Sequence, residues 1–326
     1  MAFHTRLTRL LRVRHPIISA PMAYTSGGRL AAAVTAAGGL GLIGGGYGDA
    51  EWLEREFSEA RSARVGCGFI TWSLAKHPAL LDLALAHSPA AVMLSFGSPA
   101  PFAPRIKAAG ALVICQVQSM EHAREAVAVG ADIIVAQGAE AGGHGMVRGT
   151  LTLVPEIADY LAEAAPTTVL VAAGGIADGR GLAAALMLGA DGVLIGSRFL
   201  ASAEALVKPA SQDVAIAVDG DSTVRTTGAD IARKTGWPRS FTARMMKPRS
   251  IDDCHGGEPA LADSDVMDRE GDRYVTAMQS GNTGISVGEA TGLIHDVRPA
   301  GDLLRTIAGD AERLLCDRAP GLVRTP

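Results

Sequence analysis

The sequence predicts an α/β fold, a (β/α)8 barrel, and three observations support this prediction. Short runs rich in Val, Ile and Leu alternate with Ala- and Leu-rich segments at helical spacing from residue 16 to residue 200. The apolar runs are continuous, which is typical of parallel strands covered by helices on both faces. Eight such runs at a pitch of about 25 residues favour a barrel over a doubly wound open sheet, which is the structural alternative.

The expected elements follow one another in order along this stretch. Strands are predicted at Pro16–Ala20, Leu40–Gly44, Val65–Ile70, Ala91–Phe96, Leu112–Val117, Asp132–Gln137, Thr168–Ala172 and Gly192–Ile195. Helices are predicted at Leu30–Ala37, Trp52–Ala63, Leu80–Ala86, Glu121–Val129, Val154–Ala164 and Leu182–Leu188. The sequences AVGAD (128–132) and MLGAD (187–191) recur between a helix and the next strand, where glycine commonly ends the helix.

The composition changes after Leu200. Residues 208–273 contain 10 basic and 12 acidic residues, so that 22 of these 66 residues are charged, and strand periodicity disappears. We therefore expect an inserted, mainly helical lid over one end of the barrel. Helical periodicity returns from 285 to 315, which predicts the last barrel helix. The predicted division is a barrel made of 1–205 and 280–326 with a lid at 206–279.

Composition also limits the partners of this protein. The net charge is −4 and only 4% of the residues are aromatic, which argues against nucleic acid as a ligand. The uncharged stretch 30–48 is long enough to cross a membrane, but its seven glycines argue against that interpretation. Four cysteines match no metal or disulfide spacing, and we expect Cys67 and Cys115 to be buried thiols. A cytoplasmic protein without a metal site or membrane segment is predicted.

Glycine-rich segments give two different signals. The G-x-G-x-x-G pattern at 39–44 does not predict a dinucleotide site, because its apolar residues form the expected strand and no helix follows directly. Glycines after the last two strands are better placed, since Gly174 and Gly175 follow the seventh strand and Gly196 and Ser197 follow the eighth. Loops at these positions of a barrel commonly bind phosphate at a helix N-terminus. Tight turns without a ligand are the alternative.

The segment AQGAEAGGHGMVR (136–148) follows the sixth strand, at the end of the barrel where active sites form. His144 lies beside two glycines, and an imidazole that titrates near neutrality can serve as a general base. Glu140 is a candidate for a second acid–base group, although we favour a solvated loop carboxylate. Four of the eight histidines resemble surface or helix-end residues: His77, His87, His122 and His295.

Four further residues end strands at the same mouth. Met22 and Ala23 follow the first strand, where the methionine could pack against a planar ring or simply belong to the core. Gln116 and Gln137 end the fifth and sixth strands. Their amides could point into the mouth and bind a polar heterocycle.

Taken in order and spacing, four motifs resemble those of one enzyme family: SAPMAYTSGG (19–28), AQGAEAGGHG (136–145), VAAGGIADG (171–179) and GVLIGSRFL (192–200). The chain is similar over nearly its whole length to the nitronate monooxygenases, formerly called 2-nitropropane dioxygenases. The resemblance implies an FMN-dependent TIM barrel with a smaller lid domain.

The resemblance also implies roles for particular residues. His144 corresponds to the catalytic base. The FMN phosphate would lie on the glycines and the serine after the last two strands, and Met22 and Ala23 would border the isoalloxazine. Gln137 and the backbone of Gly142 and Gly143 would approach the polar edge of the ring.

The chain departs from the family pattern at four places. Many relatives have Asn where this chain has Gly68 and Lys where it has Gln116, and both positions normally contact the flavin. A neutral glutamine removes a charge that could stabilise reduced flavin or hold an anionic substrate. Relatives often place Arg directly after the histidine, whereas here three residues precede Arg148. They also often show Gly-Gln in place of Gly281-Asn282.

The resemblance implies oxidation of alkyl nitronates or nitroalkanes by O2 to a carbonyl compound and nitrite, with His144 removing the α-proton of a nitroalkane. The alternative keeps the fold and FMN but uses NAD(P)H, as in NAD(P)H:quinone reductases and FMN-containing enoyl-acyl-carrier-protein reductases. A flavin- or phosphate-binding barrel without catalysis is a third interpretation. The sequence leaves open the physiological substrate and whether the chain forms a homodimer.

Overall fold

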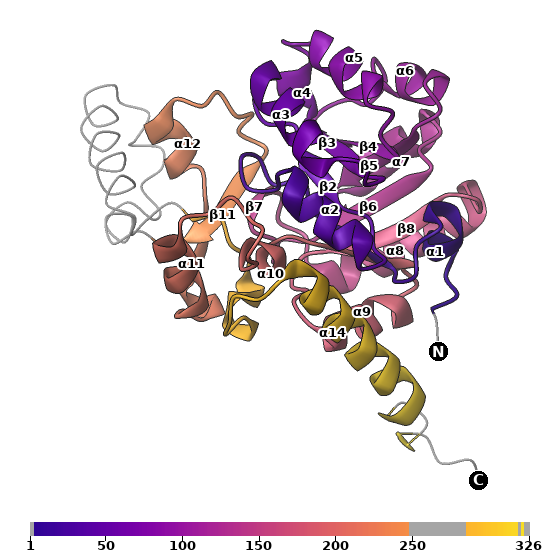
Figure 1. Ribbon diagram of the computed structural model, residues 1–326. Coiled ribbons are helices and arrows are strands. Elements are labelled where there is room, and N and C mark those ends of the chain that lie inside the picture. Colours follow the sequence, from indigo (N-terminus) through magenta and orange to yellow (C-terminus); the bar gives the residue numbers. More distant parts are fainter. Residues whose placement is uncertain (1–2, 248–284, 319–320, 323–326) are drawn as a thin grey trace.

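The predicted barrel is present in the computed structural model, which describes residues 3–247, 285–318 and 321–322 (Figure 1). Eight parallel strands form one sheet in the order β1-β9-β8-β6-β5-β4-β3-β2. The two ends of this sheet meet, because the Leu40 N–H donates to the Ile17 carbonyl and the Ser19 N–H donates to the Leu40 carbonyl, each at 3.0 Å. These bonds close the barrel and exclude an open sheet.

All eight expected strands form. Their bounds are β1 (Ile17–Ser19), β2 (Leu42–Gly44), β3 (Gly66–Ile70), β4 (Ala91–Ser95), β5 (Leu112–Val117), β6 (Ile133–Gln137), β8 (Val169–Ala173) and β9 (Gly192–Ile195). The G-x-G-x-x-G pattern therefore ends inside β2, and helix α3 starts only after Asp49, as expected.

Helices alternate with these strands. Their bounds are α2 (Gly28–Ala36), α3 (Ala50–Ala60), α4 (Thr71–Leu74), α5 (Ala79–Ala86), α6 (Ala103–Ala108), α7 (Met120–Ala128), α8 (Thr150–Ala164), α9 (Gly179–Met187), α10 (Ser197–Leu200) and α14 (Ala300–Arg313). Side-chain caps fix several starts: Asp49, Ser119 and Asp178 each accept a hydrogen bond from an N–H in the first turn. The last helix is shorter than its periodicity predicts, because Pro299 precedes its first turn and a 3-10 helix, η3 (Glu289–Leu293), lies upstream.

The strand side chains form two apolar layers. One set fills the barrel interior and includes Ile18, Ile114 and Val171. The other set faces the helices and includes Cys67 and Cys115, which are buried as expected. Burial raises the pKa of the Cys115 thiol to about 12, so this cysteine is neutral at physiological pH.

Helix α1 (Arg6–Leu11), which the sequence analysis did not predict, covers the bottom of the barrel. Its Leu7 and Leu11 are fully buried and join the interior layer. Arg6 pairs with Asp191 at 2.8 Å, which attaches the helix to the loop before β9. Helix α1 thereby covers the end of the barrel opposite the carboxyl ends of the strands.

Residues 206–247 are the described part of the segment that the sequence analysis predicts to be a lid, and we call them the lid segment or lid. They contain helices α11 (Pro209–Ile216) and α12 (Gly228–Arg233), a 3-10 helix η1 (Gly220–Ser222), and strands β10 (Thr223–Thr226) and β11 (Thr242–Met246). The sequence analysis expected the helices but missed both strands. They pair with β7 (Gly143–Gly145), from the loop after β6, in an antiparallel sheet of order β10-β11-β7. The lid and the loop that carries His144 are therefore one structural unit (Figure 1).

None of the helices that the structure describes has the length and apolar character needed to cross a bilayer.

Candidate active site

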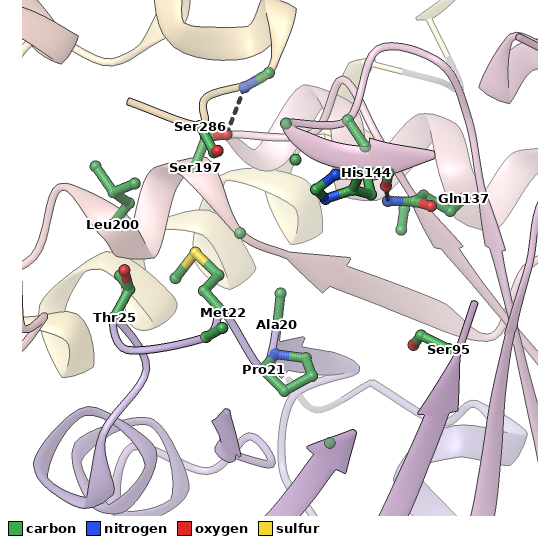
Figure 2. Close-up of a pocket in the computed structure, with 18 of the residues that line it drawn as sticks. Ala20, Pro21, Met22, Thr25, Ser95, Gln137, His144, Ser197, Leu200 and Ser286 are labelled. Atoms are coloured by element: carbon green, nitrogen blue, oxygen red, sulfur yellow. Dashed lines mark hydrogen bonds between the residues drawn. The ribbon is translucent and has the colours of Figure 1, made fainter. Parts of the chain in front are cut away.

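A cavity of about 480 Å³ lies at the carboxyl ends of the barrel strands. This volume is in the range of sites for small molecules and cofactors. The structure brings all of the predicted site residues to its wall: Met22, Ala23, Gly68, Gln116, Gln137, Gly142, Gly143, His144, Gly174, Gly175, Gly196 and Ser197. In Figure 2 the His144 ring and Gln137 lie on one side of the cavity, and Pro21 and Met22 lie on the opposite side.

One end of the cavity has the geometry of an anion site. Gly174 and Gly175 follow β8 with φ angles of +102° and +73°, a conformation that favours glycine and occurs in turns whose backbone N–H groups can bind anions. Ser197 begins α10 directly after β9, and N–H groups in a first helical turn have no partner within the helix. The Ser197 hydroxyl oxygen accepts a hydrogen bond from the Gly288 N–H at 2.9 Å, so its own proton can be donated to a ligand.

The opposite wall is apolar and closely packed. A Cβ added at Gly68 on β3 would lie 2.2 Å from the Pro21 Cγ, which real atoms do not tolerate. Glycine at this position therefore allows Pro21 to pack directly on β3, and a larger side chain such as asparagine would displace it. Met22 follows Pro21, and its sulfur lies near Gly196, which precedes helix α10.

Three glutamines form a hydrogen-bonded group beneath the histidine. Gln137 is nearly buried, and its Oε1 accepts from Gln116 Nε2 at 3.1 Å and from Gln118 Nε2 at 2.8 Å. Its own Nε2 donates to the His144 backbone carbonyl at 3.0 Å. The amides thus orient one another and hold strand β7 at its central residue, His144. The sequence analysis expected two of them at the mouth and did not single out Gln118.

His144 is held by two lid residues that the sequence analysis did not identify. Its Nε2 lies 2.8 Å from Oδ2 of Asp230 on α12, and the two side chains are only 10% and 6% exposed. The indole of Trp237 lies parallel to the imidazole, with an interplanar angle of 5° and ring centroids 3.3 Å apart. Thr235 Oγ1 donates to Asp230 Oδ1 at 2.9 Å, which fixes the carboxylate. A carboxylate against Nε2 favours the tautomer with its proton on Nε2 and its basic lone pair on Nδ1.

Two lid arginines hold the loop that precedes His144. Arg225 on β10 donates to the carbonyls of Ala139 and Ala141 at 2.9 Å, and Arg244 on β11 also donates to Ala139 at 2.9 Å. Burial, together with the nearby charge of Arg244, lowers the pKa of Arg225 to about 10. The Arg225 guanidinium remains charged at neutral pH, and both arginine side chains fix the loop backbone.

Glu140 is half-buried rather than solvated. Thr150 donates to its carboxylate from both the backbone N–H, at 2.9 Å, and the hydroxyl, at 2.8 Å. These bonds attach the loop to the start of α8. The carboxylate therefore has a structural partner, which argues for an anchoring role rather than proton transfer.

No sequence motif marked Asp230 or Trp237. Both lie in the charged stretch after Leu200, where the residues that reach the mouth are set by lid folding rather than by local spacing. Among the family departures, Arg148 pairs with Glu156 at 2.5 Å and does not line the cavity. Gly281-Asn282 lies outside the described residues.

Comparisons with known proteins identify the family of the chain and its structural neighbours. The model of the nitronate monooxygenase family matches residues 4–67 and 71–308. A nitronate monooxygenase of Neurospora crassa is 35% identical over 91% of this chain and 89% of its own. The structure of FabK from Thermotoga maritima has a TM-score of 0.82 at 29% identity, covering 98% and 99% of the two chains. Nitroalkane oxidase from Streptomyces ansochromogenes has a TM-score of 0.78 at 26% identity, covering 97% and 100%.

Proposed function

The chain belongs to the nitronate monooxygenase family, which makes it an oxidoreductase, and from this premise we propose that it oxidises alkyl nitronates and nitroalkanes with O2 to a carbonyl compound and nitrite. The observation that carries the proposal is the placement of His144. It lies on the wall of a cavity that also contains the glycine turn at Gly174 and Gly175, and a buried carboxylate lies against its ring.

We assign FMN to this cavity, because the residues present fit its parts. The turn at Gly174 and Gly175, with the first turn of α10, would hold the phosphate. The segment at Met22 and Ala23 would border the isoalloxazine, and Gln116 and Gln137 offer amide groups to its polar edge. When bound, FMN supplies the redox chemistry between the organic substrate and O2.

The protein residues would orient the substrate and move one proton. With Nε2 held by Asp230, His144 would accept the α-proton of a neutral nitroalkane on Nδ1, and the carboxylate would stabilise the resulting imidazolium. A preformed nitronate needs no base, and the histidine would then serve only to hold it. The lid, proposed to comprise residues 206–279 inserted in a barrel of 1–205 and 280–326, would position this base.

Nitrite release and oxygen consumption test the proposal. The purified flavoprotein is expected to produce nitrite from ethyl nitronate and from nitroethane. His144→Ala should retain FMN and lose turnover of nitroethane more than turnover of ethyl nitronate, while His295→Ala, at an exposed position, should change neither. Equal losses on both substrates in His144→Ala would contradict the base role.

A reductase that takes hydride from NAD(P)H is the competing function for the same cavity. It predicts rapid loss of flavin absorbance on anaerobic mixing with NADH or NADPH, and no nitrite from nitronates.

A further inference from the structure

Aromatic side chains gather at one side of the cavity far beyond their share of the composition. Seven of the 14 aromatic residues form one network of ring contacts, which we call the aromatic network: Tyr24, Tyr47, Trp52, Trp72, Phe96, Trp237 and Phe241. It includes all three tryptophans of the chain. Four of its members line the cavity: Tyr24, Tyr47, Phe96 and Trp237.

The network reaches the reactive side chain. Trp237 lies against the His144 ring, and Phe96 meets the same ring edge to face at 6.3 Å between centroids. Trp237 also contacts Tyr47 at 6.3 Å, and Tyr47 stacks with Tyr24 at 6.4 Å. A group attached to a carbon that His144 deprotonates would therefore extend along these rings.

Packing of the lid does not account for the whole network. Trp237 Nε1 donates to the Tyr47 hydroxyl at 3.2 Å, which joins the lid to the loop after β2. However, Tyr24 and Tyr47 are 43% and 36% exposed at the mouth. Aromatic rings left this open beside a cavity mark a surface for an apolar ligand.

The charge of the cavity wall points the same way. Among the described residues that line the cavity, Glu140 is the only acidic residue, and none is a lysine or an arginine. The polar side chain at the end of β5 is the neutral amide of Gln116. A carboxylate on the substrate would therefore meet no lysine or arginine among the described lining residues.

We propose that the aromatic network binds the carbon substituent of the substrate, so that the preferred substrates are nitronates with an apolar alkyl or aryl group rather than nitronates that carry a second, anionic group. The inference rests on the proposed function and specifies its substrate class. Transfer of one methylene from water to such a wall raises kcat/KM by about fourfold when the gain is realised in the transition state.

A series of nitronates tests this substrate class. For the nitronates of nitroethane, 1-nitropropane, 1-nitrobutane and 1-nitrohexane, kcat/KM for nitrite release should rise by about fourfold per methylene. Propionate 3-nitronate should be at least tenfold poorer than butyl nitronate, which is close to it in size. Equal rates along the series, or a preference for propionate 3-nitronate, would overturn the inference.

Variants connect the preference to the rings. Tyr24→Ala and Tyr47→Ala should each reduce the advantage of hexyl over ethyl nitronate by tenfold or more. Tyr47→Phe keeps the ring and removes the hydroxyl that Trp237 binds, so it should keep the advantage. Tyr160→Ala, on α8 and outside the cavity wall, is the matched control. An unchanged advantage in both alanine variants at the mouth would contradict the assignment.

Binding without turnover separates this inference from the proposed function. Since every tryptophan belongs to the network, intrinsic fluorescence reports on its occupancy. In the holoenzyme, 1-hexanol should change tryptophan emission at a concentration where hexanoate does not, and Tyr160→Ala should behave as the wild type. Equal responses to both probes, or none, would overturn the inference. Failure of every nitronate to yield nitrite would instead overturn the proposed function, and the fluorescence result would still stand.

Discussion

Replacement of Asp230 by asparagine tests how the lid prepares His144. The asparagine keeps the shape of the side chain and removes its charge. Thr235 donates to Oδ1 at 2.9 Å and would hold the amide oxygen there, which turns the amide NH2 toward His144 Nε2 at the place of the 2.8 Å contact. Nε2 must then accept a proton rather than donate one. The ring proton moves to Nδ1, and the nitrogen proposed as the base loses its lone pair to that proton.

The size of the effect follows from the role of the group. General base catalysis contributes about 10²- to 10⁴-fold, so kcat/KM for nitroethane should fall by this factor in Asp230→Asn, equivalent to about 3 to 5 kcal/mol of transition-state stabilisation. Ethyl nitronate already lacks the proton, and its turnover should fall by less than about tenfold.

The assay is nitrite release from both substrates at equal FMN content, with nitroethane deuterated at C1 as a further probe. The isotope effect on kcat/KM should be larger in Asp230→Asn than in the wild type, because proton abstraction becomes more rate-limiting. Asp221→Asn, a substitution of an exposed lid carboxylate, is the matched control and should behave as the wild type. Losses of the same size on nitroethane and ethyl nitronate would refute the tautomer argument, as would full activity on both.

Three further predictions concern the cofactor site, the barrel bottom and the thiols. In Gly174→Ala an alanine must adopt φ near +102°, and its Cβ would lie 2.9 Å from Thr150 Oγ1. FMN affinity should therefore fall at least tenfold in a fluorescence titration. Gly309→Ala is the control and should bind FMN normally, because no described atom lies within 4 Å of its Cβ. Burial, with the charge of Arg14, lowers the pKa of His15 from 6.5, so the unfolded chain binds more protons below pH 6.5 and the free energy of unfolding should fall as the pH drops through this range. His15→Gln should weaken that dependence in urea titrations between pH 5 and 8, and an unchanged slope would contradict the assignment. In Cys254→Ser, a thiol reagent at pH 8 should modify exposed Cys316 and spare Cys67 and Cys115 until urea is added; rapid native labelling of all three would contradict their burial.

The barrel could be predicted because its signals are local. Each strand is a continuous apolar run, since both faces of a barrel strand are buried, and glycine or a polar turn separates it from the next helix. The positions of Gly174 and Gly196 follow from the same logic, because each comes directly after a strand and all barrel strands end at one mouth. His144 lies at the same mouth because its segment follows β6.

The parts that sequence reasoning missed depend on contacts between distant segments. Strands β10 and β11 are short and carry arginines that bind loop carbonyls of the barrel, so they lack the apolar pattern of a buried strand. Asp230 approaches His144 across 86 residues, and nothing in its neighbourhood marks it as a partner. Helix α1 was not predicted because arginines interrupt its short apolar pattern, although its leucines face the barrel interior.

The most direct test of the central claim is the response of the flavin to each electron donor. The purified protein with bound FMN would be mixed anaerobically with ethyl nitronate and, separately, with NADH and NADPH, and the flavin absorbance would be followed. The proposed function predicts that the nitronate changes the flavin spectrum and that neither nicotinamide does so at a comparable rate. Full bleaching by NADH or NADPH, with the nitronate inert, would contradict it and assign the cavity to a reductase.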